Sequence, residues 1–72
     1  MKAILEFNLP DDEVDYKLAV NAASFYSAVW EYDQFLRSQL KHVEMSDEKH
    51  AAFQEARDKL RDYLMENDVS LN

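Results

Sequence analysis

The sequence of 72 residues contains no cysteine, no glycine and a single proline. Without cysteine the chain has neither disulfides nor a thiolate metal site, which is typical of a reducing compartment. Without glycine it has no glycine-rich phosphate loop, no dinucleotide-binding fingerprint and no nucleophile elbow, because each of these needs backbone that glycine accommodates most readily. The enzyme classes built on those motifs are therefore excluded.

Long apolar runs are also missing. Residues 1–6 contain no apolar run that is long enough for a signal peptide. No segment approaches the roughly 18 consecutive apolar residues that a membrane span requires. We therefore expect a soluble, intracellular protein that has no contact with a membrane.

The chain is small for its content of large apolar residues. A domain of this size buries only about 60% of its unfolded-state surface, and such chains usually need staples or oligomerisation. Yet 47% of the residues are hydrophobic, with four phenylalanines, four tyrosines and one tryptophan. We expect a single domain, residues 1–72, that forms a homodimer.

Negative charge dominates, with 15 acidic and 8 basic residues and a net charge of −7. Direct nucleic-acid binding is disfavoured, because phosphate contacts need lysine and arginine. An acidic face can instead meet a basic partner, including a protein that itself binds nucleic acid; the alternative is that the charge serves solubility alone. The candidate acidic partner-binding residues are Asp11, Asp12, Glu13, Asp15, Glu31 and Asp33.

Residues 2–9 alternate between apolar and polar side chains, with Ala3, Leu5, Phe7 and Leu9 on one side. This period of two predicts a β-strand. Its backbone needs a pairing partner. We expect the same strand of a second subunit, because an exposed edge favours pairing with another chain; the alternatives are the tail near Val69 or an extended arm over the helices.

The remaining chain predicts helices at about 11–21, 24–42 and 46–66, followed by a tail at 67–72. Asp11 or Asp12 is a candidate N-cap for the first helix, and Ser46 with two following acids is a clear start for the last. Asn21 suits a helix end, although one unbroken helix over 11–42 is the alternative. The expected fold is mainly α: an N-terminal strand, a short helix, a long helix and an antiparallel C-terminal helix, as a small α+β fold or helical hairpin.

Within the long helix, side-chain pairs and stripes predict the contacts. Asp33 and Arg37 are spaced for an i,i+4 ion pair, as are Glu13 and Lys17 in the first helix. A spacing of four, three, four and four residues defines an apolar stripe that consists of Phe25, Val29, Tyr32, Leu36 and Leu40. The apolar arc is wider than one partner helix covers.

The surplus aromatic side chains are either core or interface. Such residues at helical spacing are more often core, but exposed Trp and Tyr are enriched at interface hot spots. The candidates for a partner or dimer interface are Tyr26, Trp30, Tyr32 and Phe35.

No residue pattern indicates catalysis or a bound cofactor. None of the five serines lies in an activating motif, and acid pairs such as Asp47 and Glu48 are explained as helix starts. His42 and His50 lie near several acids, but no standard ligand spacing matches. We expect no catalytic residue, no metal and no cofactor.

Three stretches together are similar to a group of small proteins encoded by tailed bacteriophages and prophages. They are residues 4–12 (ILEFNLPDD), 18–21 (LAVN) and 30–41 (WEYDQFLRSQLK), of which the last is the most specific. Many members of the group have glycine after the asparagine, whereas here Ala22 follows Asn21, which puts the helix break at that point in doubt. The resemblance implies a phage product acting in the cytoplasm of the host bacterium, and no particular reaction.

Two functions fit these observations. The first is inhibition of a bacterial defence system, such as a CRISPR–Cas complex or another nuclease, in which the acidic and aromatic surface occupies a basic groove of a host protein. The second is a homodimeric adaptor or accessory factor in phage replication or recombination, without inhibitory activity. In the second case the aromatic residues form the dimer interface and the acids face solvent.

Overall fold

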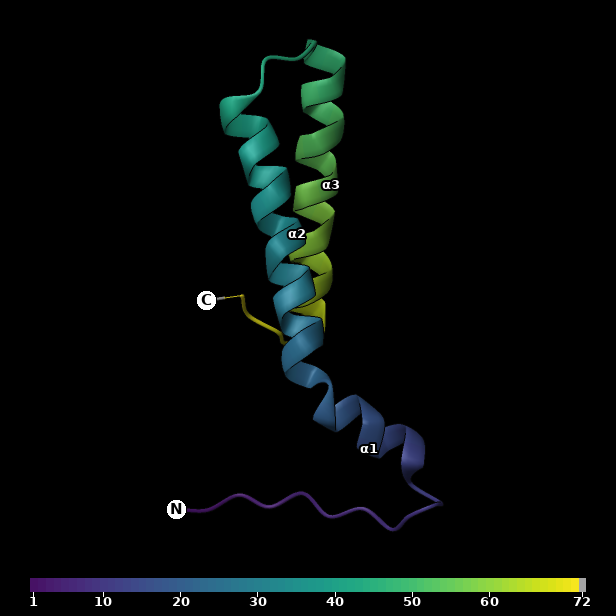
Figure 1. Ribbon diagram of the computed structural model, residues 1–72. Helices are drawn as coiled ribbons and strands as arrows, with labels where there is room; N and C mark the ends of the chain where they lie inside the picture. Colours follow the sequence, from purple (N-terminus) through teal and green to yellow (C-terminus); the bar gives the residue numbers. More distant parts are fainter. Residues whose placement is uncertain (72) are drawn as a thin grey trace.

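The computed structural model describes residues 1–71 and contains three helices: α1 (Glu13–Val20), α2 (Ala22–His42) and α3 (Asp47–Glu66). The long helices α2 and α3 lie side by side and antiparallel, as a hairpin (Figure 1). The shorter α1 precedes α2 at an angle to it, and the extended N-terminal arm turns back at the start of α1 and runs below it in this view. The expectation of a mainly α fold is confirmed.

The expected β-strand over residues 2–9 is wrong, because no strand occurs among residues 1–71. The segment is extended, but residues 1–7 make no backbone hydrogen bond, and Ile4 and Leu5 are 83% and 78% exposed. Alternation of side chains describes an extended backbone, whereas a strand also requires a neighbour. The described chain offers no neighbour, so neither an α+β fold nor a pairing with the tail forms.

The helix breaks at Asn21, which ends α1 and precedes α2. Its backbone angles, φ −97° and ψ 3°, lie outside the left-handed region. Asn21 belongs to the hydrogen bonding of both helices, since its amide donates to the Lys17 carbonyl and its carbonyl accepts from the Phe25 amide. The break is therefore a change of direction at Asn21, where the bonds of α1 end and those of α2 begin.

One seam of side chains joins α2 to α3. All of its members are buried or half-buried; they are Val29, Asp33, Leu36 and Leu40 from α2, and Phe53, Arg57, Leu60 and Leu64 from α3. Their spacing of four and three residues is that of antiparallel coiled-coil packing. Only Leu36, 2% exposed, and Asp33, 1% exposed, are fully buried. The core is therefore a single line of contact.

Local capping fixes both ends of α3. The Ser46 hydroxyl accepts a hydrogen bond of 3.2 Å from the Lys49 amide, as the sequence predicted for the helix start. At the other end Asp68 has φ 59°, in the left-handed region. The Val69 amide donates to the Leu64 carbonyl and the Asp68 amide donates to the Met65 carbonyl. These two bonds form a Schellman motif, with aspartate in the position that glycine usually occupies.

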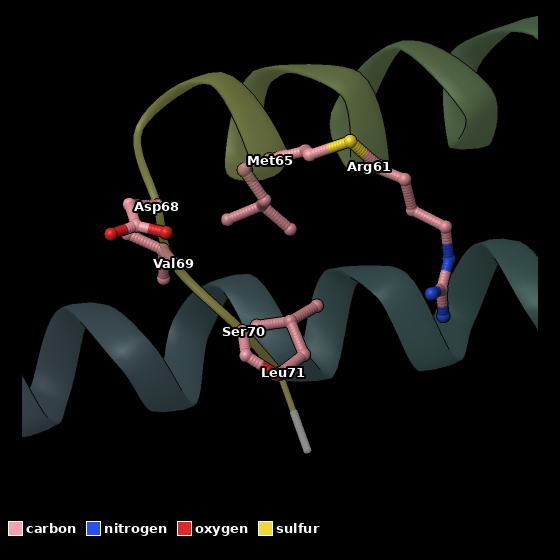
Figure 2. A pocket seen from close by; sticks show the side chains of 7 residues that line it. Arg61, Met65, Asp68, Val69, Ser70 and Leu71 are labelled. Atoms are coloured by element: carbon pink, nitrogen blue, oxygen red, sulfur yellow. The ribbon is translucent and has the colours of Figure 1, made fainter.

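The Schellman motif decides where the tail goes. Figure 2 shows the chain turning at Asp68 and running back across α2 toward Leu71. Val69 and Leu71 reach the apolar side chains near the start of α2, where they share a hollow with Phe25 and Val29. A local turn at the end of α3 thus adds the tail to the open end of the hairpin.

The folded chain is far more open than a lone globular domain. It exposes 6401 Å² of surface, whereas scaling gives about 4,650 Å² for a folded monomer of this mass. Its radius of gyration is 17.1 Å, against about 11 Å for a compact domain of this length. The chain therefore exposes about 1,750 Å² more surface than a typical folded monomer of its mass.

Candidate protein-binding surface

The one buried charge in the described chain is Asp33, which lies in the middle of the seam. Its Oδ1 accepts a hydrogen bond of 3.2 Å from Arg57 Nε, and its Oδ2 accepts one of 3.2 Å from Arg61 Nη2. The two arginines are one helical turn apart on α3, so both reach the same carboxylate. The side chain of Arg57 is 20% exposed and that of Arg61 is 52% exposed.

This cluster changes the sequence-based assignment of Asp33. The carboxylate points into the hairpin and is unavailable to an external partner, so Asp33 does not belong to an acidic surface. The expected ion pair with Arg37 is also wrong, because Asp33 pairs across the hairpin instead of along its own helix. A buried acid is stable here because two guanidinium groups satisfy both of its oxygens.

The other predicted acids are spread over two places. Asp12 is half-buried, and its Oδ2 accepts a hydrogen bond of 2.9 Å from the Asn8 amide. Glu13 pairs with Lys17 at 3.2 Å, as predicted from the spacing. Asp11 and Asp15 are exposed beside them, at the start of α1, whereas Glu31 is exposed on α2. The acidic residues thus leave a small cluster on α1 and do not gather on the hairpin.

The predicted aromatic residues are all exposed to a large degree. The exposed fractions are 40% for Tyr26, 44% for Trp30, 53% for Tyr32 and 49% for Phe35. The rings of Tyr32 and Phe35 are 6.3 Å apart, and Phe35 also contacts Phe53 of α3 at 6.4 Å. Tyr32 and Phe35 therefore belong to a cluster that crosses from α2 to α3.

That cluster is part of a continuous apolar face of the hairpin. On each helix most of its residues come one position before a seam residue, and in an antiparallel pair such positions lie on the same side. Phe53 of the seam and Phe25 near the open end extend this surface. We call this the aromatic face; it consists of Phe25, Ala28, Tyr32, Phe35, Ala52, Phe53, Ala56 and Tyr63. Phe25 is 57% exposed and Tyr63 is 59% exposed. The sequence places the α3 residues of this face on one apolar stripe, but sequence reasoning named only residues of α2 as a candidate interface.

The opposite side of the seam has a different chemistry. One position after the seam, α2 carries Trp30, Gln34, Arg37 and Lys41, and Arg61 lies on the facing side of α3. Arg37 and Lys41 line a shallow hollow of about 330 Å³ near the end of α2. Trp30 and Tyr26 line another of about 270 Å³. The four predicted aromatic residues are thus divided between two surfaces. Tyr26 and Trp30 line a hollow with Ser27 and Glu31, whereas Tyr32 and Phe35 lie on the aromatic face.

A larger apolar hollow lies at the open end of the hairpin. Its volume is about 650 Å³, and side chains of α1, α2, α3 and the tail line it. The lining residues are Leu18, Ala22, Ala23, Phe25, Tyr26, Val29, Leu64, Val69 and Leu71. The hollow continues the apolar surface at Phe25 toward α1. Sequence reasoning missed it, since the tail reaches this place only through the turn at Asp68.

Two searches of residues 1–71 bear on other kinds of site. No group of three or more His, Cys, Asp or Glu side chains is arranged to hold a metal ion. No helix in that range is long and apolar enough to cross a membrane.

No family model, no curated protein and no solved structure matches this chain.

Proposed function

We propose that this chain is a phage-encoded, non-catalytic protein-binding module, and that it acts as a homodimeric adaptor or accessory factor in phage replication or recombination. The observation that carries a binding role is the excess of exposed surface, about 1,750 Å² beyond that of a typical monomer. Much of the exposed surface is apolar and aromatic. The phage origin and the bacterial cytoplasm rest on the resemblance of residues 30–41.

The burial of Asp33 supports an apolar mode of binding over charge mimicry. The central acid of the hairpin pairs with Arg57 and Arg61, and the aromatic face beside it carries no acid. A protein that imitated nucleic acid would present a row of unpaired carboxylates to its target. The aromatic face presents rings and alanines instead, and the exposed acids of α3, such as Glu55 and Asp62, lie on its outer side.

A second candidate is the inhibitor of a host defence system, such as a CRISPR–Cas complex or another nuclease. The observation that favours it is the exposed acidic cluster of Asp11, Glu13 and Asp15 at the start of α1. Together with Asp12 and Glu31, this cluster would meet a basic host surface.

Affinity capture in two salt concentrations separates the candidates. Tagged protein is used to capture partners from phage-infected cells at about 0.1 M and about 0.5 M salt. An apolar adaptor keeps its partner at both salt concentrations. Binding by the acidic cluster weakens steeply at the higher concentration, because the screening length is about 10 Å at the lower concentration and shortens as salt is added. The matched variants are Asp15→Asn for the acidic cluster and Trp30→Ala for the aromatic side chains.

The phage phenotype completes the test. Deleting the gene lowers phage yield on undefended hosts if the protein is a replication accessory. An inhibitor is needed only on hosts that carry the defence system. A deletion that has no effect on either host, combined with the absence of a reproducible partner, would disprove both functions.

A further inference from the structure

The aromatic face is an uncovered apolar surface of the hairpin. It joins α2 to α3 through the contacts of Tyr32 with Phe35 and of Phe35 with Phe53. Phe25 and Tyr63, each more than half exposed, extend the same surface toward the open end. Two helices that meet along one seam leave such a face without cover, and a four-helix bundle is the usual arrangement that covers it.

We propose that the aromatic face binds the aromatic face of a second copy of this chain, so that two hairpins form a four-helix bundle. This contact would be the dimer interface of the adaptor proposed above. The inference rests on the proposed function only in taking the protein to be a homodimer. It replaces the pairing of N-terminal strands as the contact between subunits.

The surface that the chain exposes is large enough for an interface with a second copy. A standard protein interface removes about 800 Å² from each partner. The chain exposes 6401 Å², which exceeds the surface of a typical monomer by about 1,750 Å². One standard interface corresponds to about half of this excess, to which the exposed N-terminal arm also contributes.

Charge also favours a second copy. Each chain has a net charge of −7, so two copies repel each other wherever acids would meet. The aromatic face has no Asp or Glu, and Gln39 and Lys59 lie in the same stripes. The next residue of the α3 stripe is Glu66, which lies beyond Tyr63 at the end of the helix. The acids of α3, such as Glu55 and Asp62, lie on the side turned away from α2. The aromatic face is thus a surface on which identical chains meet without opposing acids.

Shape supports the same pairing. Ala28 lies between Phe25 and Tyr32 on α2, and Ala56 lies between Phe53 and Tyr63 on α3. Small residues leave space near the helix backbones, into which aromatic rings of the second copy fit. A two-fold axis makes the same patch serve on both subunits, as in most homodimers.

The test compares two alanines of α3 that are both exposed, Ala56 on the aromatic face and Ala51 on the outer side. The purified chain is studied by sedimentation equilibrium, and we expect the unaltered protein to be a dimer. Ala56→Glu places two like charges in the interface and raises the dimer Kd by about 100-fold or more. Ala51→Glu leaves the Kd within about threefold, since it stays in solvent. Circular dichroism verifies that both variants remain helical.

Three outcomes would overturn the proposal. One is a strict monomer at about 100 μM, a second is a dimer that Ala56→Glu leaves intact, and a third is a dimer that dissociates when residues 1–6 are removed. If Ala56→Glu reduces helicity, Tyr32→Lys on α2 provides a second variant of the same face. Because these measurements use the purified protein alone, their failure is distinct from failure to capture a partner or to change phage yield.

Discussion

Asp33 of α2 and Arg57 of α3 are joined through Oδ1 and Nε at 3.2 Å, in the middle of the seam between the two long helices. Twenty-four residues separate them in the sequence. Arg61, also on α3, donates a hydrogen bond to the other oxygen of the same carboxylate, so both oxygens of Asp33 are satisfied. The alignment of the hairpin is therefore set by a charge cluster as well as by Leu36.

Replacing Asp33 with asparagine tests how much the cluster contributes to the hairpin. The amide keeps the shape of the side chain but loses the charge, and hydrogen bonds to charged groups contribute about 1.5–3 kcal/mol each to stability. We expect the free energy of unfolding to fall by about 1.5–3 kcal/mol, because Arg61 is half-exposed and turns to water. Urea unfolding followed by circular dichroism measures it. Asp62→Asn, on the exposed outer side of α3, is the matched control and changes stability little; an equal loss in both variants would contradict the assignment.

A double replacement separates stability from alignment. The double variant Asp33→Leu, Arg57→Leu replaces the buried acid and one of its two arginine partners with apolar side chains. Such exchanges are often neutral or stabilising by about 1–4 kcal/mol, whereas removing one partner is costly. We expect the double variant to unfold at a urea concentration no lower than the unaltered chain, at equal protein concentration. If it proves as unstable as Asp33→Asn, the ion pair supplies net stability that leucine packing does not replace.

The cap of α3 is a local contribution that can be measured by itself. Ser46→Ala removes the acceptor of the Lys49 amide and leaves that donor to water. Loss of a serine N-cap typically costs about 1 kcal/mol, which we expect in thermal and urea unfolding. Ser38→Ala, at an exposed position inside α2, removes a hydroxyl without a capping role and is expected to be neutral or slightly stabilising. The cap assignment fails if the two variants behave alike.

The turn at Asp68 predicts an uncommon outcome, in which glycine stabilises a helix end. A residue other than glycine in the left-handed region is disfavoured by roughly 1–2 kcal/mol, and Asp68 has φ 59°. Part of the gain expected from replacing Asp68 with glycine is offset, because glycine loses more backbone freedom on folding. We expect Asp68→Gly to raise the free energy of unfolding by about 0.5–1 kcal/mol. Asp68→Ala retains the unfavourable geometry and is the comparison; a loss of stability in the glycine variant would argue against the Schellman turn.

Local signals in the sequence were sufficient for the helices. Ser46 with two acids marks the start of α3, and the pair Glu13–Lys17 forms as its spacing predicts. Both depend on residues within one helical turn, where sequence and structure are closely linked. The strand over residues 2–9 failed because it depends on a partner that alternation of side chains does not reveal.

The site was predicted only in part, and Asp33 is the reason. An apolar stripe selected from the sequence uses Tyr32, whereas the seam uses Asp33 together with Val29 and Leu36. Hydrophobicity alone cannot rank an acid above a tyrosine at a core position. The signal that was present is the spacing of Asp33 with Leu36 and Leu40, combined with two arginines one turn apart on the other long helix.

The connection between α2 and α3 is four residues long, from residue 43 to residue 46. A segment of that length closes in well under a microsecond, and helices of about twenty residues form within about a microsecond. Association between proteins, by contrast, usually proceeds at about 10⁵–10⁷ M⁻¹s⁻¹. Each newly made chain therefore has its helices paired long before it meets another molecule. The lifetime of the lone hairpin, and its exposure to proteases, is set by how many copies or partners the cell contains.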